Sequence, residues 1–271
     1  MTDITGHTRI FGIVADPIHH VKTPQGINRL LDARKFDGVM VPIHVDSEGL
    51  GAMVEGLRRM NNLGGFVVTV PHKTAMPALC DELTPAAQRV GAVNVVRRTA
   101  GGRLVGGMLD GEGFVAGLRS AGIEPAGLTA YLAGAGGAAS AIAYALAQAG
   151  VSRLTVANRT PAKAEELIAR LKEDFPGLAM ALGTDDPSQH DLVVNGTSLG
   201  LRDGDALPLN TDRLSAHQIV AEIIMQPAET PLLQAARAKG CRVHHGAPML
   251  ASQIALMAAF MGVPATQETG T

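Results

Sequence analysis

Short apolar runs alternate with helix-like segments along the first third of the chain. Continuous apolar runs bounded by turn residues are typical of buried strands, whereas apolar residues three and four positions apart indicate helices. The alternation predicts a parallel sheet, and two runs around Ala100–Gly102 predict a hairpin at its edge. The predicted strands are Ile10–Val14, Val39–Ile43, Phe66–Val70, Val93–Val96 and Leu104–Gly106, and the predicted helices are Thr23–Leu31, Leu50–Met60 and Lys73–Cys80.

The pattern from Thr129 onward predicts a second sheet. An apolar run, Thr129–Ala133, leads directly into Gly134–Ala139 and a long apolar helix that ends near Gly150. Strands and helices then alternate as far as His244, which is typical of a six-stranded nucleotide-binding fold. The remaining predicted elements are the strands Leu154–Asn158, Ala179–Leu182, Leu192–Asn195, Ile219–Ile224 and Arg242–His244, the helices Ala162–Glu173 and Thr230–Lys239, and a final apolar helix, Pro248–Phe260, that is expected to return to the first unit.

Composition narrows the function classes. The chain has 271 residues, a net charge of -2 and scattered Lys and Arg, so we expect no nucleic-acid partner. No apolar stretch reaches the ~20 residues of a membrane span, and residues 1–7 show no secretory signal. Cys80 and Cys241 lie far apart and outside metal-ligand spacings, so we expect neither a disulfide framework nor a metal site. These features predict a cytoplasmic protein.

The clearest binding motif is Gly134-x-Gly136-x-x-Ala139, which lies between a predicted strand and a predicted helix. Its glycines permit a tight turn and let the backbone approach a pyrophosphate, while the helix N-terminus supplies N–H groups. The motif predicts dinucleotide binding, and a Gly-rich turn needed only for packing is the alternative. The residues expected to hold the dinucleotide are Gly134, Ala135, Gly136, Gly137 and Ala138.

The end of the next strand indicates which dinucleotide is bound. An acidic residue there would bind the ribose 2′-OH of NAD, but the chain has Asn158, Arg159 and Thr160, with Lys163 beyond. An Arg fork and a second cation suit a 2′-phosphate, which favours NADP as the cofactor. If Arg159 and Lys163 are only solvated charges at a helix start, NAD is the alternative cofactor.

Short stretches in a specific order and spacing also carry a family resemblance. They are Pro17–Pro24, Gly65–Lys73, Gly91–Asn94, Gly106–Gly113, Gly134–Ala139, Asn158–Thr160, Asn195–Gly200, Thr230–Leu233 and Gly246–Gln253. On these residues the chain resembles the shikimate dehydrogenase family nearly end to end.

The resemblance implies an enzyme with a two-domain α/β fold. An N-terminal α/β substrate domain, residues 1–110, would be completed by a returning C-terminal helix in residues 246–271. A Rossmann domain, residues 111–245, would bind NADP, with catalysis between the two. The implied reaction is reversible hydride transfer between NADP(H) and a secondary alcohol of shikimate or a related cyclic hydroxy compound. Reduction of 3-dehydroshikimate by NADPH to shikimate would serve aromatic amino acid biosynthesis.

Lys73 and Asp110 are the catalytic pair that the resemblance implies. The chemistry agrees, because oxidation of an alcohol needs a group that removes the hydroxyl proton and the reverse reaction needs a proton donor. A Lys facing an Asp can hold that proton, since the Asp favours the charged Lys while burial opposes it. A solvated lysine at a helix start is the alternative for Lys73. A helix N-cap is the alternative for Asp110 and is compatible with catalysis.

The same match implies further contacts. Ordinary structural roles are the alternatives: a turn contact for Asn94, a strand position for Thr69 and a helix cap for Gln253. The implied substrate residues are Thr23, Thr69, Asn94 and Gln253, with Val21 and Met225 expected in the same pocket, and the further implied cofactor residues are Thr197 and Ser198.

Several positions that are polar in the family are apolar in this chain. Val21 stands where the family has one of two serines that hold the substrate carboxylate, and Val67 stands for an Asn. Met108–Leu109 replace an Asn-Thr pair, and Met225 replaces a Tyr that helps bind the carboxylate. Each lost donor costs on the order of 1–3 kcal/mol. We therefore expect slow turnover of shikimate or quinate, or a preference for a less polar or differently substituted cyclic alcohol.

Three alternatives stay open: a quinate or other cyclic-alcohol dehydrogenase that uses NAD, a methylenetetrahydrofolate dehydrogenase, and a non-catalytic dinucleotide-binding sensor. The sequence shows no folate-specific pattern, and a sensor has no need of Lys73 and Asp110. The expected partner is a small-molecule substrate, and the expected assembly is a monomer or homodimer.

Overall fold

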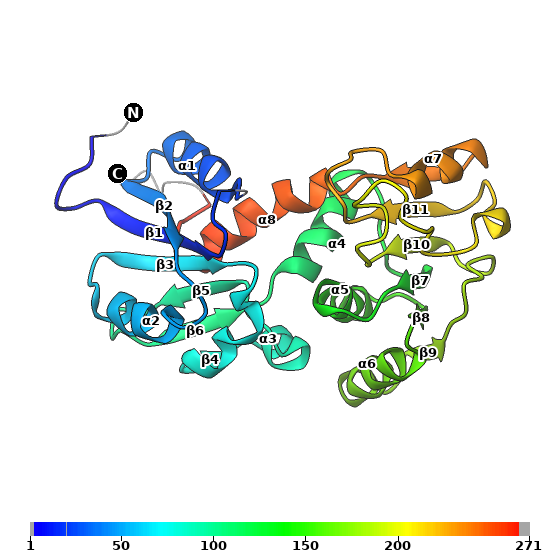
Figure 1. The fold of residues 1–271 in the computed structure, drawn as a ribbon, viewed down its shortest axis with the longest axis horizontal. Coiled ribbons are helices and arrows are strands. Elements are labelled where there is room, and N and C mark those ends of the chain that lie inside the picture. The colour runs from blue at the N-terminus through cyan, green and yellow to red at the C-terminus, as the bar shows by residue number, and fades with distance from the viewer. Residues whose placement is uncertain (1–2, 20, 266–271) are drawn as a thin grey trace. The chain divides into compact units, whose positions relative to one another are not determined.

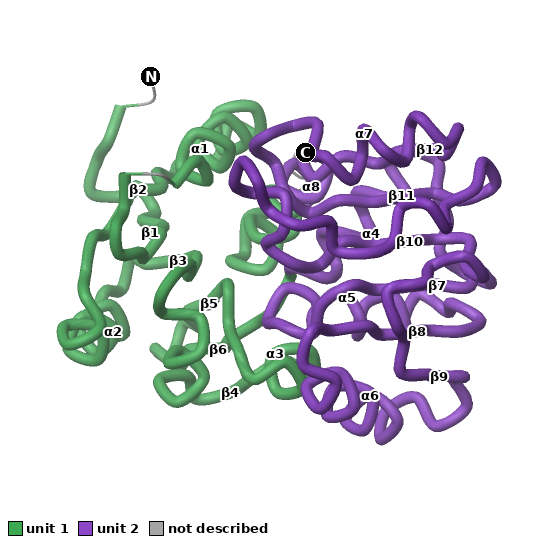
Figure 2. Tube along the Cα trace, turned by 45° about the vertical axis from the view of Figure 1, so that its right-hand side comes forward, with its two compact units in different colours: residues 1–109, 253–271 green, residues 110–252 purple. Residues whose placement is uncertain are grey.

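The computed structural model describes residues 3–19 and 21–265, so the expected domain ends at residues 1–2 and 266–271 lie outside the described residues. The chain forms two compact units (Figure 2): residues 1–109 with 253–271 form unit 1, and residues 110–252 form unit 2. The units divide after residues 109 and 252, and the sequence predicted divisions after residues 110 and 245. Each unit contains a six-stranded sheet with helices, and the predicted α/β class is confirmed.

Unit 1 contains a mixed sheet with the strand order β2-β1-β3-β5-β6-β4 (Figure 1). β1 pairs in parallel with both β2 and β3, whereas β5 and β6 form an antiparallel hairpin. The hairpin was predicted, but its expected edge position is wrong, because β4 pairs beyond β6. The strands are β1 (Arg9–Ala15), β2 (Gly38–His44), β3 (Leu63–Val68), β4 (Glu82–Leu83), β5 (Val95–Arg98) and β6 (Leu104–Gly107).

The segment after β3 differs from its prediction. β3 ends at Val68, so Thr69 lies in the turn beyond the strand. Two short 3₁₀ helices replace the predicted helix Lys73–Cys80, because Pro77 lacks the backbone N–H that an α-helix would need there. The helices of unit 1 are α1 (Thr23–Ala33), α2 (Leu50–Arg59), η1 (His72–Thr74), η2 (Met76–Leu79) and α3 (Pro85–Val90).

The C-terminal helix α8 (Ala247–Phe260) completes the core of unit 1. Its residues Met257 and Ala258 are buried in one cluster with Phe11, Ile13 and Ile27. Residues 253–260 of the helix therefore pack with the first unit, and the expected return is confirmed.

Unit 2 contains a parallel sheet with the order β12-β11-β10-β7-β8-β9. This is the Rossmann order, and ligands of such sheets bind where the strand order reverses, here between β7 and β10. β11 ends at Glu222, two residues before its predicted end. The elements are α4 (Asp110–Ser120), β7 (Thr129–Ala133), α5 (Gly137–Gln148), β8 (Arg153–Ala157), α6 (Pro161–Asp174), β9 (Ala179–Leu182), β10 (Leu192–Asn195), η3 (Thr211–Arg213), β11 (Ile219–Glu222), α7 (Pro231–Ala238) and β12 (Arg242–His244).

Helices α4 and α5 approach each other closely at Gly111. A Cβ at this position would lie 2.0 Å from the carbonyl oxygen of Ala141 and 2.8 Å from the Cβ of Ala145. Only glycine leaves room for the two backbones at this distance. None of the described helices has the length and apolar character needed to span a membrane.

Candidate active site

Three predicted site residues of unit 1 lie together after the carboxyl end of β3. Thr69 and Lys73 follow this strand, and Asn94 directly precedes β5. The backbone N–H of Val68 donates to the carbonyl of Asn94 at 2.8 Å, and that of Val93 donates to the carbonyl of Lys73 at 2.9 Å. Carboxyl ends of parallel strands are the usual ligand edge of α/β sheets, so this is the candidate substrate side.

The backbone around Lys73 is held in place by its buried neighbour His72. The imidazole Nε2 lies 2.8 Å from the carbonyl oxygen of Val45, which only accepts, so Nε2 carries the proton. The backbone N–H of His72 donates to the carbonyl of Thr69 at 2.9 Å. Lys73 itself is half-buried. Sequence reasoning missed His72, whose only signal is its place beside the lysine.

Asn94 is buried and joins two chain segments. The Asn94 side-chain oxygen accepts from the backbone N–H of Leu109 at 2.9 Å, and the Asn94 backbone N–H donates to the carbonyl of Gly107 at 2.9 Å. The turn contact that was the alternative for Asn94 is therefore present. Its role toward a substrate stays a prediction.

The apolar replacements pack with one another. Val21, Val67 and Leu109 belong to, or pack against, the same buried cluster as Met257 of α8. Met108 is buried as well. Val21, Val67 and Leu109 thus have apolar neighbours, which explains how the chain accommodates these three replacements. The remaining substrate-site predictions lie as follows: Thr23 is buried at the first turn of α1, Gln253 is buried on α8, and Met225 lies 45% exposed after β11.

A cavity of about 430 Å³ borders Val21. Its lining includes the polar side chains of His19, Gln25 and Asn28. Both the oxygen and the nitrogen of the Asn28 amide are bonded to the backbone of Met40, at 2.8 and 3.0 Å. The cavity therefore presents the His19 imidazole and the Gln25 amide beside Val21.

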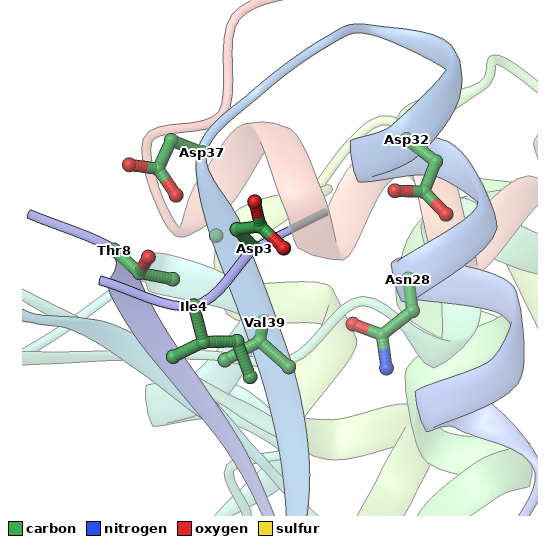
Figure 3. Close-up of a pocket in the computed structure, with 8 residues that line it drawn as sticks. Asp3, Ile4, Thr8, Asn28, Asp32, Asp37 and Val39 are labelled. Carbon is green, nitrogen blue, oxygen red and sulfur yellow. The ribbon is translucent and has the colours of Figure 1, made fainter. Parts of the chain in front are cut away.

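A second cavity, of about 180 Å³, lies at the amino ends of β1 and β2. Figure 3 shows Asn28 and Asp32 projecting from α1 toward the strand that carries Val39, with Asp3 on the N-terminal segment. Across the part of the chain that the structure describes, no group of three or more His, Cys, Asp or Glu could hold a metal ion. The cavity lies at the opposite end of these strands from Thr69 and Lys73.

The predicted dinucleotide turn of unit 2 has space for a phosphate group. Gly134 has a φ of 114°, and a Cβ there would lie 3.0 Å from the carbonyl oxygen of Gly196, so this position requires glycine. A Cβ at Gly136 or Gly137 would meet nothing within 4 Å. Gly136 is the N-cap residue of α5 and provides no side-chain cap, so the first N–H groups of the helix are available to an anion. The turn therefore fits a pyrophosphate.

The end of β8 carries the predicted selectivity residues. The Asn158 side chain donates to the carbonyl of Thr160 at 2.9 Å, which shapes the turn into α6. Arg159 and Lys163 are both exposed there, and no carboxylate occupies positions 158–160. Two accessible cations without an acidic neighbour in this turn fit a 2′-phosphate.

The predicted cofactor residues Thr197 and Ser198 follow β10 in a loop organised by Asn195. The Asn195 side-chain oxygen accepts from the N–H of Thr197 at 3.0 Å and from its hydroxyl at 2.7 Å. The Asn195 nitrogen donates to the buried carboxylate of Glu222 at 3.0 Å. Burial raises the pKa of Glu222, while its hydrogen bonds oppose that rise. Sequence reasoning missed Glu222, although an acidic residue that ends an apolar strand is a visible signal.

Asp110 is the first residue of α4 and is 7% exposed. A carboxylate at this helix position is favoured by the helix dipole. Asp110 belongs to unit 2 and Lys73 to unit 1. Their roles as a catalytic pair stay a prediction.

Comparison with known proteins identifies both parts of the chain. Residues 13–96 match the family model described as "Shikimate dehydrogenase substrate binding domain", and residues 121–198 match "Shikimate / quinate 5-dehydrogenase". A shikimate dehydrogenase (NADP(+)) of Rubrobacter xylanophilus is 42% identical over 259 residues, covering 92% of this chain and 89% of that protein.

Solved structures agree in fold along nearly the whole chain. Shikimate 5-dehydrogenase from Listeria monocytogenes, in complex with shikimate and NAD, has a TM-score of 0.89 at 31% identity, covering 96% of this chain and 94% of that one. The ligand-free 5-ketofructose reductase of Gluconobacter sp. strain CHM43 has a TM-score of 0.87 at 30% identity, covering 95% and 94%. With matches of this extent in both sequence and structure, the chain belongs to the shikimate dehydrogenase family.

Proposed function

We propose that this enzyme catalyses reversible hydride transfer between NADP(H) and the secondary alcohol of shikimate, reducing 3-dehydroshikimate in the biosynthetic direction. The observation that carries the proposal is the 42% identity, over 92% of the chain, to a shikimate dehydrogenase (NADP(+)). Lys73, Asp110 and the glycine turn at Gly134 are the residues that the family resemblance implies for this reaction. The predicted cytoplasmic location and the monomeric or homodimeric state belong to the same proposal.

The cofactor would be held entirely by unit 2. The open turn at Gly136 and Gly137 would receive the pyrophosphate, and Arg159 with Lys163 would bind the 2′-phosphate. Thr197 and Ser198, on the loop after β10, would contact the cofactor at the point where the strand order reverses. When bound, NADPH supplies the hydride for reduction of the carbonyl carbon.

Lys73 and Asp110 would handle the proton. In the reducing direction the Lys73 ammonium gives a proton to the carbonyl oxygen of the substrate, and in the oxidising direction the neutral amine removes it from the hydroxyl. A carboxylate partner stabilises the charged lysine, which is the role proposed for Asp110. The contacts of His72 with Val45 and Thr69 hold the Lys73 backbone in one position for this transfer.

The substrate hydroxyls would be oriented by polar side chains of unit 1. Thr69 and Asn94 lie at the carboxyl end of β3 beside Lys73, and we assign them the ring hydroxyls. Gln253 of α8 and Thr23 of α1 complete the proposed set. A buried donor or acceptor that meets its partner only in the correct substrate provides strong selectivity, because the wrong substrate leaves that group unpaired.

A second candidate substrate is a neutral polyhydroxy ketone. Val21 and Met225 stand where the family places two groups that bind a carboxylate, and Val21 packs against the apolar core of unit 1. The same fold occurs in a protein with a different named activity, because the similar Gluconobacter structure is named a 5-ketofructose reductase. A substrate without a carboxylate does not need the missing donors. Quinate, oxidised with NAD, is the third candidate substrate.

Absorbance at 340 nm tests the proposal with shikimate, quinate and neutral polyols, each with NADP and with NAD. We expect NADP-dependent oxidation of shikimate, and we expect Lys73→Ala to abolish turnover while NADPH binding stays near that of the wild type. Lys172→Ala, which removes an exposed lysine of α6, is the matched control and keeps full activity. Unchanged turnover in Lys73→Ala would refute the role of Lys73. Turnover of a neutral polyol but not of shikimate would favour the second candidate.

A further inference from the structure

We propose that Glu222 is a positioning residue, whose buried carboxylate fixes the two loops that follow β10 and β11 and thereby orients the cofactor contacts of Thr197 and Ser198. The inference rests on the proposed use of NADP by unit 2. It assigns a task to a side chain that the proposed chemistry does not otherwise use.

The carboxylate of Glu222 is fully occupied by donors. One oxygen accepts from the backbone N–H groups of Ile223 and Ile224, at 2.8 and 3.0 Å. The other accepts from the Thr230 hydroxyl at 3.1 Å, and the Asn195 side-chain nitrogen donates to both oxygens, at 3.0 and 3.2 Å. The side chains of Glu222, Asn195 and Thr230 are each 0% exposed. Buried hydrogen bonds to a charged group are among the stronger ones in proteins, so this cluster rigidly joins three segments.

Glu222 sets the orientation of the Asn195 side chain. An ionised carboxylate only accepts hydrogen bonds, so the Asn195 nitrogen must face it and the Asn195 oxygen must face away. That oxygen receives both the N–H and the hydroxyl of Thr197, and the nitrogen also donates to the carbonyl of Leu199 at 3.0 Å. The conformation of the loop after β10 therefore depends on the charge of a residue on β11.

The second branch of the cluster holds the loop after β11. Thr230 donates its hydroxyl hydrogen to Glu222 and accepts from the N–H of Leu233 at 3.3 Å, which caps α7. Residues 223–230, which include the exposed Met225, are thus fixed at both ends by one carboxylate.

The location of the cluster explains why its effect would reach the cofactor. A Cβ on Gly134 would lie 3.0 Å from the carbonyl of Gly196, so the loop after β10 touches the first glycine of the dinucleotide turn. Both loops lie at the carboxyl edge of the sheet, on the side of the strand-order reversal. Any change in the orientation of Asn195 is transmitted to that edge.

Glu222→Gln tests the proposal without changing the size of the side chain. The new side-chain NH₂ group must face either the two backbone N–H groups or the Asn195 amide. In both orientations two hydrogen-bond donors face each other and cannot form a bond. We expect the Kd for NADPH and the KM for NADP to rise at least about tenfold, with a smaller change in kcat, as loss of a hydrogen bond to a charged group implies. Glu222→Asp, which keeps the charge, should retain tighter binding than Glu222→Gln.

A control variant separates positioning from folding. Asp191→Asn removes a carboxylate at the amino end of β10, which accepts from the N–H and hydroxyl of Thr129 at 2.8 and 2.7 Å. This control should lower stability and leave Kd and KM unchanged.

NADPH fluorescence measures binding independently of turnover. If Glu222→Gln, like Asp191→Asn, only lowers the folded fraction and leaves Kd and KM unchanged, the positioning role is refuted. The same holds if Glu222→Asp binds NADPH no better than Glu222→Gln. Wild-type protein that binds NADPH but oxidises none of the substrates would refute the proposed function and leave this inference standing. Wild-type protein that does not bind NADPH would refute both.

Discussion

The side-chain oxygen of Asn94 accepts a hydrogen bond from the backbone N–H of Leu109 at 2.9 Å, and both residues are buried. Asn94→Ala would leave this N–H without a partner in the protein interior. The cost of an unsatisfied buried donor is about 1–3 kcal/mol, so we expect the free energy of unfolding to fall by that amount. Urea denaturation measures the change.

The matched control for this prediction is Asn61→Ala. Asn61 is exposed, and its side-chain oxygen accepts a hydrogen bond from the Arg98 side chain at 3.3 Å. Surface changes of this kind usually alter stability by less than about 0.5 kcal/mol. Equal losses in the two variants would show that the Asn94–Leu109 bond has no special energetic weight.

Gly136→Ala should separate cofactor binding from folding. A Cβ at this position meets nothing within 4 Å, so the folded protein without ligand has no clash to relieve. The methyl group would instead occupy the space proposed for the pyrophosphate, and we expect NADPH affinity to fall at least about tenfold, or about 1.4 kcal/mol. Calorimetry of NADPH binding checks the expected loss of affinity, and thermal unfolding of the same preparation checks that the stability is unchanged.

Gly134→Ala is the variant to compare with Gly136→Ala. Its φ of 114° and the 3.0 Å approach to Gly196 make any side chain strained, so this variant should lose stability as well as affinity. A Gly136→Ala protein that binds NADPH normally would contradict the proposed site of the pyrophosphate.

Arg159→Ala should change the choice of cofactor. Because Arg159 is exposed at the end of β8, its removal leaves the fold intact and deletes a charge-assisted contact to the 2′-phosphate. We expect KM for NADP to rise about tenfold or more, while KM for NAD changes less than about twofold, since a charge-assisted hydrogen bond contributes about 1.5–3 kcal/mol. Equal losses with both cofactors would count against recognition of the 2′-phosphate.

Acid should lower the free energy of unfolding, partly through protonation of Asp191. Hydrogen bonds from the N–H and hydroxyl of Thr129 hold the pKa of Asp191 below its usual range. A depressed carboxyl pKa stabilises the folded state at all pH values above the unfolded pKa, near 3.9, and this contribution disappears as pH falls through the folded pKa. We expect Asp191→Asn to lower the free energy of unfolding at pH 7.

The difference between wild type and Asp191→Asn should shrink once pH falls below about 4, where the unfolded chain takes up the proton first. Chemical denaturation at pH 7, 5, 4 and 3 provides the measurement. A difference that stays constant over this range would show that the pKa of Asp191 is the same in the folded and unfolded states.

Much of the fold follows from patterns that are local in sequence. The six strands of unit 2 were all predicted. The central strands β7, β8, β10 and β11 are mostly buried and read as continuous apolar runs, whereas the edge strands β9 and β12 are more exposed and were inferred from the alternation of strands and helices. The helix Lys73–Cys80 was mispredicted because the apolar spacing was given more weight than Pro77, which excludes a regular α-helix. The two-residue strand β4 is too short to produce any pattern.

The candidate site was only partly predictable, for a physical reason. Glycines, lysines and strand ends are visible in sequence, so the turn at Gly134 and the position of Lys73 could be inferred from motifs. Glu222, Asn195 and Thr230 meet only through tertiary folding, because they come from three separate segments. Val21 likewise packs against a cluster that includes Met257 of the distant helix α8, an association that no local pattern contains.

The glycine at the start of α4 has a consequence for the chemistry. Because Gly111 leaves no gap against Ala141, the helix that begins with Asp110 and the helix that begins at the dinucleotide turn share one rigid frame. The contact between Gly111 and Ala141 thereby fixes the position of Asp110, the acidic group proposed for proton handling, relative to the glycine turn proposed to bind the pyrophosphate. Evolution of the substrate pocket in the other unit can proceed without disturbing that relative position, which suits a scaffold whose relatives bear the names of different dehydrogenases and reductases.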